Sequence, residues 1–334
     1  MNPDIQAHPG PADTVSEISS CPRADYFAVS SWDNQVCDLI LFKVRVYQLA
    51  NGQPTPVTSM THEQPVLSVS WSSDGMKLFS GGADKMLRVM DMNTGQTANI
   101  QAHDQTIRTV RWDYQNNTIV TGSWDKTIKY WDLRQAQPAA TVALPERVYA
   151  MDTIGQWLVI GTAERHVVLV RLTSPTTIYK TIVSPLKWQT RSIACLSDAS
   201  GYCVGSIEGR VGIQYFEDKK SSENFAFRCH RTGSNAFPVN VLAVHPTYGS
   251  LGTGGADGSY CVWDKDSKSR LFMVSDLGSP ITGLCFSRHS DVALYSLGYD
   301  WSKGYENYLP SAKPGVYVRK LTKAEIEPKG HRRR

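Results

Sequence analysis

Histidine, hydroxyl and carboxylate side chains recur together along this chain, and these three types could form a nucleophilic catalytic triad. His103, Ser123 and Asp125 are one such set. A triad of this kind needs a serine hydroxyl that is exposed on a sharp, strained turn, with a histidine beside it to act as the base. The sequence contains no nucleophile elbow, no glycine-rich phosphate loop and no metal-ligand cluster. We therefore predict that the three side chains belong to a buried hydrogen-bond chain, and that the protein is not an enzyme and needs no metal or cofactor.

The segment around these residues repeats along the chain. Residues 121–133 read Thr-Gly-Ser-Trp-Asp-Lys-Thr-Ile-Lys-Tyr-Trp-Asp-Leu: a strand end, a tight polar turn and an alternating strand closed by Trp-Asp. The same small-x-acid turn occurs at residues 31–33, 82–84, 123–125, 162–164, 206–208, 255–257 and 298–300. Successive acids are 39 to 51 residues apart, against about 40–45 for a WD repeat. Seven turns therefore predict seven repeats.

Period-2 alternation defines four strands within a repeat. In the second repeat these are residues 66–71, 77–80, 87–90 and 97–100, separated by polar turns. The chain is therefore predicted to be all-β, a seven-bladed WD40 β-propeller with four-stranded antiparallel blades, over residues 13–320. The first strand of each blade should line the central channel with small or β-branched side chains.

The two ends of the chain should complete this ring. Residues 5–8 and residues 100–103 both read Ile-Gln-Ala-His, an outer strand followed by the structural histidine. We expect residues 1–12 to supply the missing strand of the seventh blade. The C-terminal residues 321–334 end in Lys-Gly-His-Arg-Arg-Arg, which predicts a loose basic tail or a weak nuclear-import signal.

Composition excludes several classes of protein. No run of 18 apolar residues could span a membrane, and the first thirty residues lack the basic-then-apolar order of a signal peptide. The seven cysteines are an odd number and none are spaced as a zinc knuckle, so they should be reduced packing residues. The net charge of +4 is too small on its own to indicate nucleic-acid binding. We expect a soluble protein of the nucleus and cytoplasm, with no membrane insertion.

The first repeat contains an interruption. Val36 should continue directly into Arg45, but residues 37–44 intervene, and removing them restores a regular interval between the first two turns. This predicted insertion is apolar and strongly β-prone, so that its exposure at a sheet edge would favour aggregation. Two explanations remain open: a retained non-coding stretch that is not truly translated, and a lineage-specific loop.

The middle residues of the seven turns should lie on one rim, because the turn between the second and third strands always faces the same way. They are Trp32, Ala83, Trp124, Ala163, Ile207, Ala256 and Tyr299. Large aromatic residues at exposed turns gain nothing unless a partner covers them. With Arg191, Glu208 and Arg210 nearby, they predict a partner-binding surface. The alternative is that the aromatic residues pack on neighbouring loops.

A second candidate surface is the edge between the fifth and sixth blades. Phe225 and Phe227 share one face of an outer strand there, next to Arg228 and Arg231. The following blade contributes Trp263, Asp264, Lys265 and Lys268. Aromatic side chains between cations can stack bases and neutralise phosphates, which is how single-stranded nucleic acid is held without sequence readout. The alternative is that the two phenylalanines only pack between blades.

Several stretches resemble a known family, the WD-repeat propellers that bind GLEBS motifs. These stretches are residues 184–191, 206–211 and 225–231. The family has two branches, a messenger-RNA export factor of the nuclear pore and a spindle-checkpoint protein. Residues 121–127, 144–147, 161–165 and 298–304 are similar to the export factor. The resemblance runs from about residue 13 to residue 329, interrupted only by residues 37–44.

This resemblance implies that the chain docks, through the aromatic rim, on a helical GLEBS segment of the nucleoporin that carries GLFG repeats. Arg210 would pair with acidic side chains of that segment, with Trp32, Trp124 and Arg191 as floor contacts. The edge would correspond to the groove in which viral antagonists of the family insert a methionine flanked by acids, in competition with nucleic acid. The insertion puts the contribution of the first blade to the rim in doubt.

The sequence thus predicts a non-enzymatic adaptor that helps messenger ribonucleoprotein leave the nucleus, located at the nuclear pore and also in the cytoplasm. Its expected partners are the GLFG-repeat nucleoporin, RNA or another single-stranded nucleic acid, the mRNA export receptor machinery and mitotic proteins. Two alternatives use the same fold: a spindle-checkpoint scaffold for kinetochore kinases, and a substrate receptor of a ubiquitin ligase. Residues 298–304 favour the export factor over the checkpoint protein.

Overall fold

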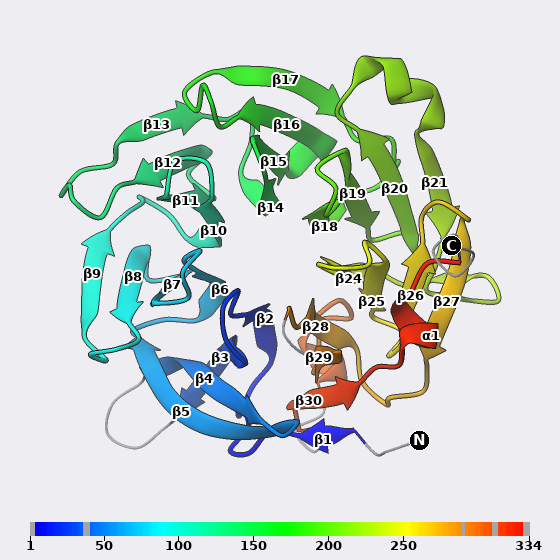
Figure 1. Cartoon of the computed structure of the whole chain (residues 1–334), viewed down its shortest axis with the longest axis horizontal. Coiled ribbons are helices and arrows are strands. Elements are labelled where there is room, and N and C mark those ends of the chain that lie inside the picture. Colours follow the sequence, from blue (N-terminus) through cyan, green and yellow to red (C-terminus); the bar gives the residue numbers. More distant parts are fainter. Residues whose placement is uncertain (1–3, 36–40, 289–290, 309–312, 330–334) are drawn as a thin grey trace.

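The computed structural model describes residues 4–35, 41–288, 291–308 and 313–329. Within them, seven four-stranded antiparallel sheets stand around a central axis as the blades of a ring (Figure 1). In each blade the first strand lies next to the axis and the fourth strand lies outside. The predicted seven-bladed WD40 β-propeller is therefore confirmed.

The first four blades follow one another along the chain. Blade one consists of β2 (Val15–Ser20), β3 (Tyr26–Gln35), β4 (Leu41–Ala50) and β5 (Gln53–His62). Blade two consists of β6 (Val66–Trp71), β7 (Lys77–Gly82), β8 (Met86–Asp91) and β9 (Thr97–Gln101). Blade three consists of β10 (Ile107–Asp113), β11 (Thr118–Ser123), β12 (Thr127–Trp131) and β13 (Ala140–Ala143). Blade four consists of β14 (Val148–Ile154), β15 (Trp157–Thr162), β16 (His166–Arg171) and β17 (Ile178–Val183).

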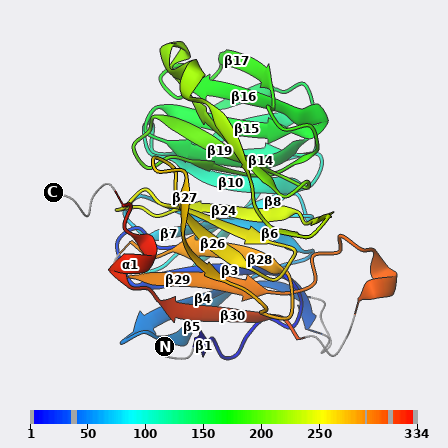
Figure 2. The same cartoon turned by 90° about the vertical axis from the view of Figure 1, so that its right-hand side faces the viewer.

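The last three blades carry the longer connections. Blade five consists of β18 (Thr190–Cys195), β19 (Gly201–Ser206), β20 (Arg210–Tyr215) and β21 (Phe225–Arg228). The hairpin β22 (Arg231–Thr232) and β23 (Asn235–Ala236) leads to blade six, with β24 (Val239–Val244), β25 (Leu251–Gly255), β26 (Tyr260–Asp264) and β27 (Ser269–Val274). Blade seven contains β28 (Ile281–Phe286), β29 (Val292–Leu297), β30 (Gly315–Lys320) and β1 (Ile5–Gln6). Helix α1 (Lys323–Ile326) and the orange loop with the 3-10 helix η3 (Tyr305–Asn307) project from opposite faces of the ring (Figure 2).

The hydrophobic core lies between neighbouring blades. Strands in the middle of a blade, such as β15, are buried along their whole length, because adjacent blades cover both faces of the sheet. One cluster joins blade three to blade four through Val120, Ile128, Leu158 and Val168. Short continuous apolar runs bounded by turns are the sequence pattern of such strands. The result is a rigid scaffold whose turns and loops are presented at the two faces of the ring.

The N-terminal segment closes the ring. β1 pairs antiparallel with β30, with Ile5 opposite Val318, and supplies the outer strand of blade seven. The Asp4 carboxylate accepts a hydrogen bond from the Tyr295 hydroxyl at 2.6 Å and lies 3.3 Å from the Arg319 guanidinium. Blade seven is therefore built from both ends of the chain.

The C-terminal segment is docked as far as Lys329. Leu321 and Ile326 are buried against Val262 and Phe286. The backbone N–H of Lys329 donates to the Asp264 carboxylate at 3.1 Å. The first part of the predicted C-terminal tail, residues 321–329, is therefore held on the ring, because its apolar side chains find a hydrophobic site on blades six and seven. The terminal basic run, residues 330–334, lies outside the described residues.

Blade one accommodates its additional residues in the hairpin between β3 and β4. Val44 is a fully buried residue of β4 and pairs with Ser30. It occupies the position that Ile128 has in blade three. Assigning Val44 to an insertion was therefore wrong: the additional length lies before it. The remainder of the insertion, through residue 40, lies outside the described residues.

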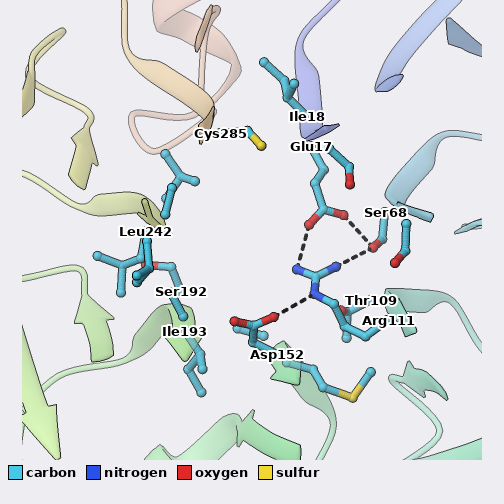
Figure 3. Close-up of a pocket in the computed structure, with 18 of the residues that line it drawn as sticks. Glu17, Ile18, Ser68, Thr109, Arg111, Asp152, Ser192, Ile193, Leu242 and Cys285 are labelled. Atoms are coloured by element: carbon cyan, nitrogen blue, oxygen red, sulfur yellow. Dashed lines mark hydrogen bonds and ion pairs between the residues drawn. The ribbon is translucent and has the colours of Figure 1, made fainter. Parts of the chain in front are cut away.

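The central channel differs from the prediction of small and β-branched side chains. Glu17, Arg111 and Asp152 project into it from blades one, three and four (Figure 3). The Arg111 guanidinium lies 2.7 Å from the Glu17 carboxylate and 3.5 Å from the Asp152 carboxylate. The Ser68 hydroxyl donates to Glu17 at 2.6 Å. The prediction was wrong here because opposite charges from separate blades pair with one another, which makes their partial burial tolerable.

The cysteines behave as packing residues. The six within the described ranges are free, and five of them are buried. Burial raises the pKa of these thiols, for example that of Cys261 to about 11, which keeps them protonated and unreactive at neutral pH. In the same ranges there is no helix of the length and apolar character that a membrane span requires.

Candidate functional site

His103 and Asp125 lie side by side, but their arrangement stabilises the fold. His103 Nδ1 is 2.8 Å from Asp125 Oδ2, and its Nε2 is 2.7 Å from the Thr121 hydroxyl. The Trp131 indole donates to the same hydroxyl at 2.8 Å. Ser123 donates to backbone carbonyls instead. The predicted buried hydrogen-bond chain is present, with Thr121 in the place considered for Ser123; we call His103, Thr121, Asp125 and Trp131 the blade-three network.

Equivalent networks exist in blades two and six. They join His62 to Ser80 and Asp84, and His230 to Thr253 and Asp257. Burial opposes ionisation of Asp125, but hydrogen bonds from His103 and Thr127 outweigh it and hold the pKa of Asp125 well below its usual range. No group of His, Cys, Asp and Glu side chains in the described part of the chain is arranged to hold a metal ion.

The turns between second and third strands lie on one face of the ring. In each blade the middle residue of this turn donates a backbone hydrogen bond to the residue that precedes the first strand. The Trp32 N–H donates to the Thr14 carbonyl at 2.9 Å, and the Trp124 N–H donates to that of Thr106 at 3.0 Å. In blade seven the corresponding N–H belongs to Gly298. Gly298 is therefore the middle residue of that turn, and the assignment of Tyr299 to this position was wrong by one residue.

The three predicted aromatic residues differ in their surroundings. Trp32 is 42% exposed and Trp124 is 37% exposed. The Tyr299 ring instead packs 5.3 Å from that of Trp301, and its hydroxyl donates to the Gly304 carbonyl at 2.6 Å. The alternative of packing on a loop thus describes Tyr299, whereas the two tryptophans stand at the surface.

Two further exposed tryptophans lie on this face. Trp188 is 60% exposed in the connection that leads to β18, and Trp301 is 44% exposed in the loop that follows β29. Sequence reasoning missed them because it considered only the middle residues of the turns. Segments that precede a first strand reach the same face, so a search of those segments would have found Trp188. We call Trp32, Trp124, Trp188 and Trp301 the aromatic rim.

Blade five adds charges to this face. Arg210 Nε lies 3.6 Å from the Glu208 carboxylate, with the two side chains 34% and 15% exposed. Glu208 also accepts the backbone N–H of Lys187 at 3.3 Å. The Arg231 guanidinium donates to the Glu208 carbonyl at 2.6 Å. An acid and two cations are therefore held together at one turn.

Arg191 is separated from this pair and lies at the mouth of the central channel. Its guanidinium Nε donates to the Asn240 side-chain oxygen at 3.3 Å, and both residues line the channel. The predicted rim residues therefore occupy four settings: Trp32 and Trp124 at turns, Tyr299 packed on its loop, Glu208 and Arg210 as a pair, and Arg191 at the channel.

Phe225, Phe227 and Trp263 form a continuous aromatic run along the edge between blades five and six. The ring centroids of Phe225 and Phe227 are 6.3 Å apart, and those of Phe227 and Trp263 are 4.9 Å apart. The Lys268 ammonium lies 4.6 Å from the centroid of the Phe225 ring. All three rings are partly buried against the core of blades five and six. The edge is thus both inter-blade packing and accessible surface.

Asp264 and Lys265 have structural partners. Asp264 is 2% exposed, and its carboxylate accepts hydrogen bonds from the Ser267 hydroxyl at 2.6 Å and from the Lys329 backbone. The Lys265 ammonium lies 2.8 Å from Asp266 and 3.6 Å from Asp198. Both predicted groove residues are therefore engaged in contacts within the fold, in the turn that follows β26 and with Asp198 and Lys329.

The other end of the same edge is basic. Arg228 and Arg231 are exposed, and together with Arg270 they line a pocket of about 260 Å³ beside Trp263. Sequence reasoning missed Arg270, which faces Trp263 across the β26–β27 pairing. Arg228 is the strand-pairing partner of Arg210, so that the rim and the edge meet at blade five. The edge groove below comprises Phe225, Phe227, Arg228, Arg231, Trp263, Lys268 and Arg270.

Comparison with known proteins agrees with this architecture. The model of the family "WD domain, G-beta repeat" matches residues 54–91, 95–132 and 223–264. The chain is 43% identical to the "Poly(A)+ RNA export protein" of Schizosaccharomyces pombe, over 98% of this chain and 94% of the relative. It is also 43% identical to the "mRNA export factor GLE2" of Chaetomium thermophilum, over 98% and 92%, and to the "Protein RAE1" of Arabidopsis thaliana, over 98% and 93%.

The alignment with these relatives extends over nearly the full length of both partners and includes all seven blades. A shared fold alone would leave the function open. Identity of this extent makes the relationship specific. The chain belongs to the family of WD-repeat messenger-RNA export factors.

Proposed function

We propose that this chain acts in messenger-RNA export as a non-catalytic adaptor, which docks on a nucleoporin GLEBS segment through the aromatic rim and contacts RNA through the edge groove. Participation in mRNA export is supported by the names of the relatives, which are an RNA export protein and mRNA export factors. We expect the chain to concentrate at the nuclear pore, to occur in the cytoplasm as well, and to meet the export receptor machinery and mitotic proteins there.

One observation carries the docking proposal: four exposed tryptophans share the face on which Arg210 stands. Tryptophan and arginine are the residue types that dominate binding energy at interfaces, and isolated turns gain nothing from exposing them. A rigid ring holds them in place, so little conformational entropy is lost when a partner covers them.

The Glu208–Arg210 pair explains a preference for an acidic partner. The pair is 3.6 Å apart and partly solvated, so it contributes little to stability. A carboxylate from the docking segment can share Arg210 without leaving a buried charge unpaired. Arg228 and Arg231 add positive charge next to it, which speeds association with an acidic segment.

The edge groove supports contact with RNA. Its rings offer stacking surfaces, and Lys268, Arg228 and Arg270 place cations along the same edge. Stacking on aromatic side chains together with phosphate neutralisation holds single strands without reading their sequence. We therefore expect RNA binding that depends on salt and tolerates changes of sequence.

The docking proposal is tested with a purified nucleoporin GLEBS segment and the Arg210→Glu variant. Reversing this charge should weaken binding at least tenfold, because one attractive contact is replaced by repulsion. The matched control is Arg134→Glu, which changes an arginine that is 87% exposed in the turn after β12, on the opposite face. If both variants and the unmodified chain bound the GLEBS segment with equal affinity, the proposal that this segment docks on the rim would be wrong.

The RNA proposal is tested by titrating a single-stranded RNA at several salt concentrations. The double variant Phe227→Ala, Lys268→Ala should lower affinity and reduce the slope of log affinity against log salt by about 0.7 for each phosphate that the chain no longer neutralises. Binding of the GLEBS segment should not change. An unaltered salt slope would contradict the assignment of RNA to this groove.

A further inference from the structure

Every first strand of the ring carries a β-bulge at the same place. In each blade the pairing of the first and second strands skips one residue near the start of the first strand. The skipped residues are Ser16, Leu67, Arg108, Tyr149, Arg191, Asn240 and Thr282. A bulge re-aims the side chain of its additional residue. The seven bulges therefore form a ring of re-aimed side chains.

This ring lies at the mouth of the channel on the face of the aromatic rim. In each blade a backbone carbonyl two residues before the bulge accepts an N–H from the turn between the second and third strands. In blade three, for example, the Thr106 carbonyl accepts the Trp124 N–H, and Arg108 is the bulge residue. Six of the seven bulge residues, all but Leu67, line the central channel, which has a volume of about 540 Å³. The channel mouth is therefore a concave surface whose chemistry is set by one residue from each blade.

The bulge residues are not distributed evenly by charge. Arg108, Tyr149 and Arg191 stand on three consecutive blades, while the remaining four positions hold uncharged residues. Arg147 adds a third guanidinium group, which lies 5.9 Å from the centroid of the Tyr149 ring. One side of the mouth is therefore an arc of three cations around a tyrosine.

The nearest carboxylates are engaged elsewhere. Deeper in the channel, Glu17 and Asp152 face the guanidinium group of Arg111 (Figure 3). Asp300 accepts a hydrogen bond from Asn240 at 2.9 Å, and Asn240 in turn accepts one from Arg191. Within the described residues, no carboxylate forms an ion pair with Arg108, Arg147 or Arg191. The arc therefore presents three guanidinium groups that form no ion pair within the described part of the chain.

The electrostatics agree with this geometry. Burial and the neighbouring charge of Arg191 lower the pKa of Arg108 to about 10, while Glu17 acts in the opposite direction. Arg108 thus remains charged at neutral pH in the presence of a second cation. An anion between the two groups would relieve their repulsion.

We propose that the channel mouth binds a phosphate monoester, held by Arg108 and Arg191 with Arg147 at its edge. A phosphate monoester carries nearly two negative charges and three acceptor oxygens, which matches several guanidinium groups better than a single carboxylate does. Arginine forks bind such groups through paired hydrogen bonds. Asp300 is a positioning residue, because it orients the Asn240 amide that fixes Arg191.

Two sources share this chemistry: a phosphorylated side chain on a segment that crosses the rim, and a free phosphate ester. The site goes beyond the proposed function, because it requires neither Arg210 nor the edge groove. Its test needs no nucleoporin segment and no RNA, so that its failure is distinguishable from a failure of the docking proposal.

The experiment titrates the full chain with inorganic phosphate, free O-phosphoserine and a blocked glycine tripeptide with central phosphoserine, and follows the phosphorus NMR signal. We expect saturable binding of one equivalent. The variants Arg108→Gln and Arg191→Gln should each weaken it by about tenfold. The control Arg134→Gln, on the opposite face, should bind like the unmodified chain. Thermal unfolding of all variants verifies that they fold, and Arg191→Lys, which keeps the charge but not the fork, should retain part of the affinity.

The three ligands separate the two sources. Tighter binding of the peptide than of free phosphoserine supports a phosphorylated side chain, and the reverse order supports a free ester. Unsaturable binding of all three ligands would overturn the proposal. The same conclusion would follow if Arg108→Gln and Arg191→Gln bound phosphate as well as Arg134→Gln.

Discussion

Blades three and five use the same turn position in opposite ways. In blade three Asp125 is locked by His103 at 2.8 Å, and its side chain is 9% exposed. In blade five the residue at this position is Glu208, which is 15% exposed and lies 3.6 Å from the more exposed Arg210 guanidinium. A single position in the repeat thus belongs to a histidine network in one blade and to a partly exposed ion pair in another.

The difference arises from the partners available to the acid. The positions of Thr121 and Trp131 are taken in blade five by Val204 and Gln214, according to the pairing of the strands. The position of His103, two residues after the outer strand β9, is taken by Pro185, which comes two residues after the outer strand β17. A valine and a proline cannot accept or donate the bonds of the network. The acid of blade five therefore has no histidine network and contacts Arg210 and the Lys187 N–H instead.

The largest contrast should appear between two tryptophans of blade three. Trp131 is 3% exposed and belongs to the network, whereas Trp124 is 37% exposed. Trp131→Ala should lower the free energy of unfolding by about 3–5 kcal/mol. Trp124→Ala should change it by less than about 1 kcal/mol, while weakening GLEBS binding roughly 30-fold. Urea denaturation and binding titrations of both variants measure this, and a similar stability loss in both would erase the contrast.

The two turn acids should differ next. Asp125→Ala leaves His103 without its acceptor in the interior, so we expect a loss of about 3 kcal/mol. Glu208→Ala removes a partly solvated pair and should cost less than about 1 kcal/mol. The measurement is the midpoint of urea denaturation at constant slope. Equal losses would show that blade five relies on its acid as blade three does.

Acid should weaken the blades that contain networks. Burial lowers the pKa of His62, so its imidazole takes up a proton more readily in the unfolded chain than in the folded one. The free energy of unfolding therefore falls as the pH drops below about 6.5, the ordinary pKa of histidine. The pKa values of Asp84, Asp125 and Asp257 are also lowered, so a second loss follows below about 4. Urea denaturation between pH 8 and pH 3 measures both steps. His62→Gln should flatten the first step only; an unchanged first step would assign it to other groups.

The smallest effect is expected in blade one. Deleting residues 37–44 removes Val44 from the core, but it joins Arg45 directly to Val36, which follows Asp33 by three positions as Ile128 follows Asp125. A valine thus remains available for the buried position, so the free energy of unfolding should change by less than about 1 kcal/mol. Urea denaturation of the deletion variant measures this change. A larger loss would show that the long hairpin itself supports the blade.

The sequence allowed the fold to be predicted because its signal is local and repeated: a turn and an alternating strand recur seven times, and Trp-Asp closes that strand in blades three and six. The network around His103 followed from the same repeat. The charges in the channel could not be predicted, since Glu17 and Arg111 are 94 positions apart and nothing in either strand identifies the residue with which it pairs. The seven bulges were equally invisible, because a skipped pairing leaves no mark on alternation over so short a strand. Tyr299 was misplaced for a related reason, as a shift of one residue preserves the small-x-acid pattern.

The closure of blade seven has a consequence for biosynthesis. β1 leaves the ribosome long before its partner β30, which begins at Gly315. At about 5–20 residues per second, translation of the intervening chain takes roughly 15 to 60 seconds. Throughout this interval six blades can form in order, yet the first strand has no place to bind. The ring therefore remains an open arc until β30 emerges, and only then can β1 pair with it and complete the seventh blade.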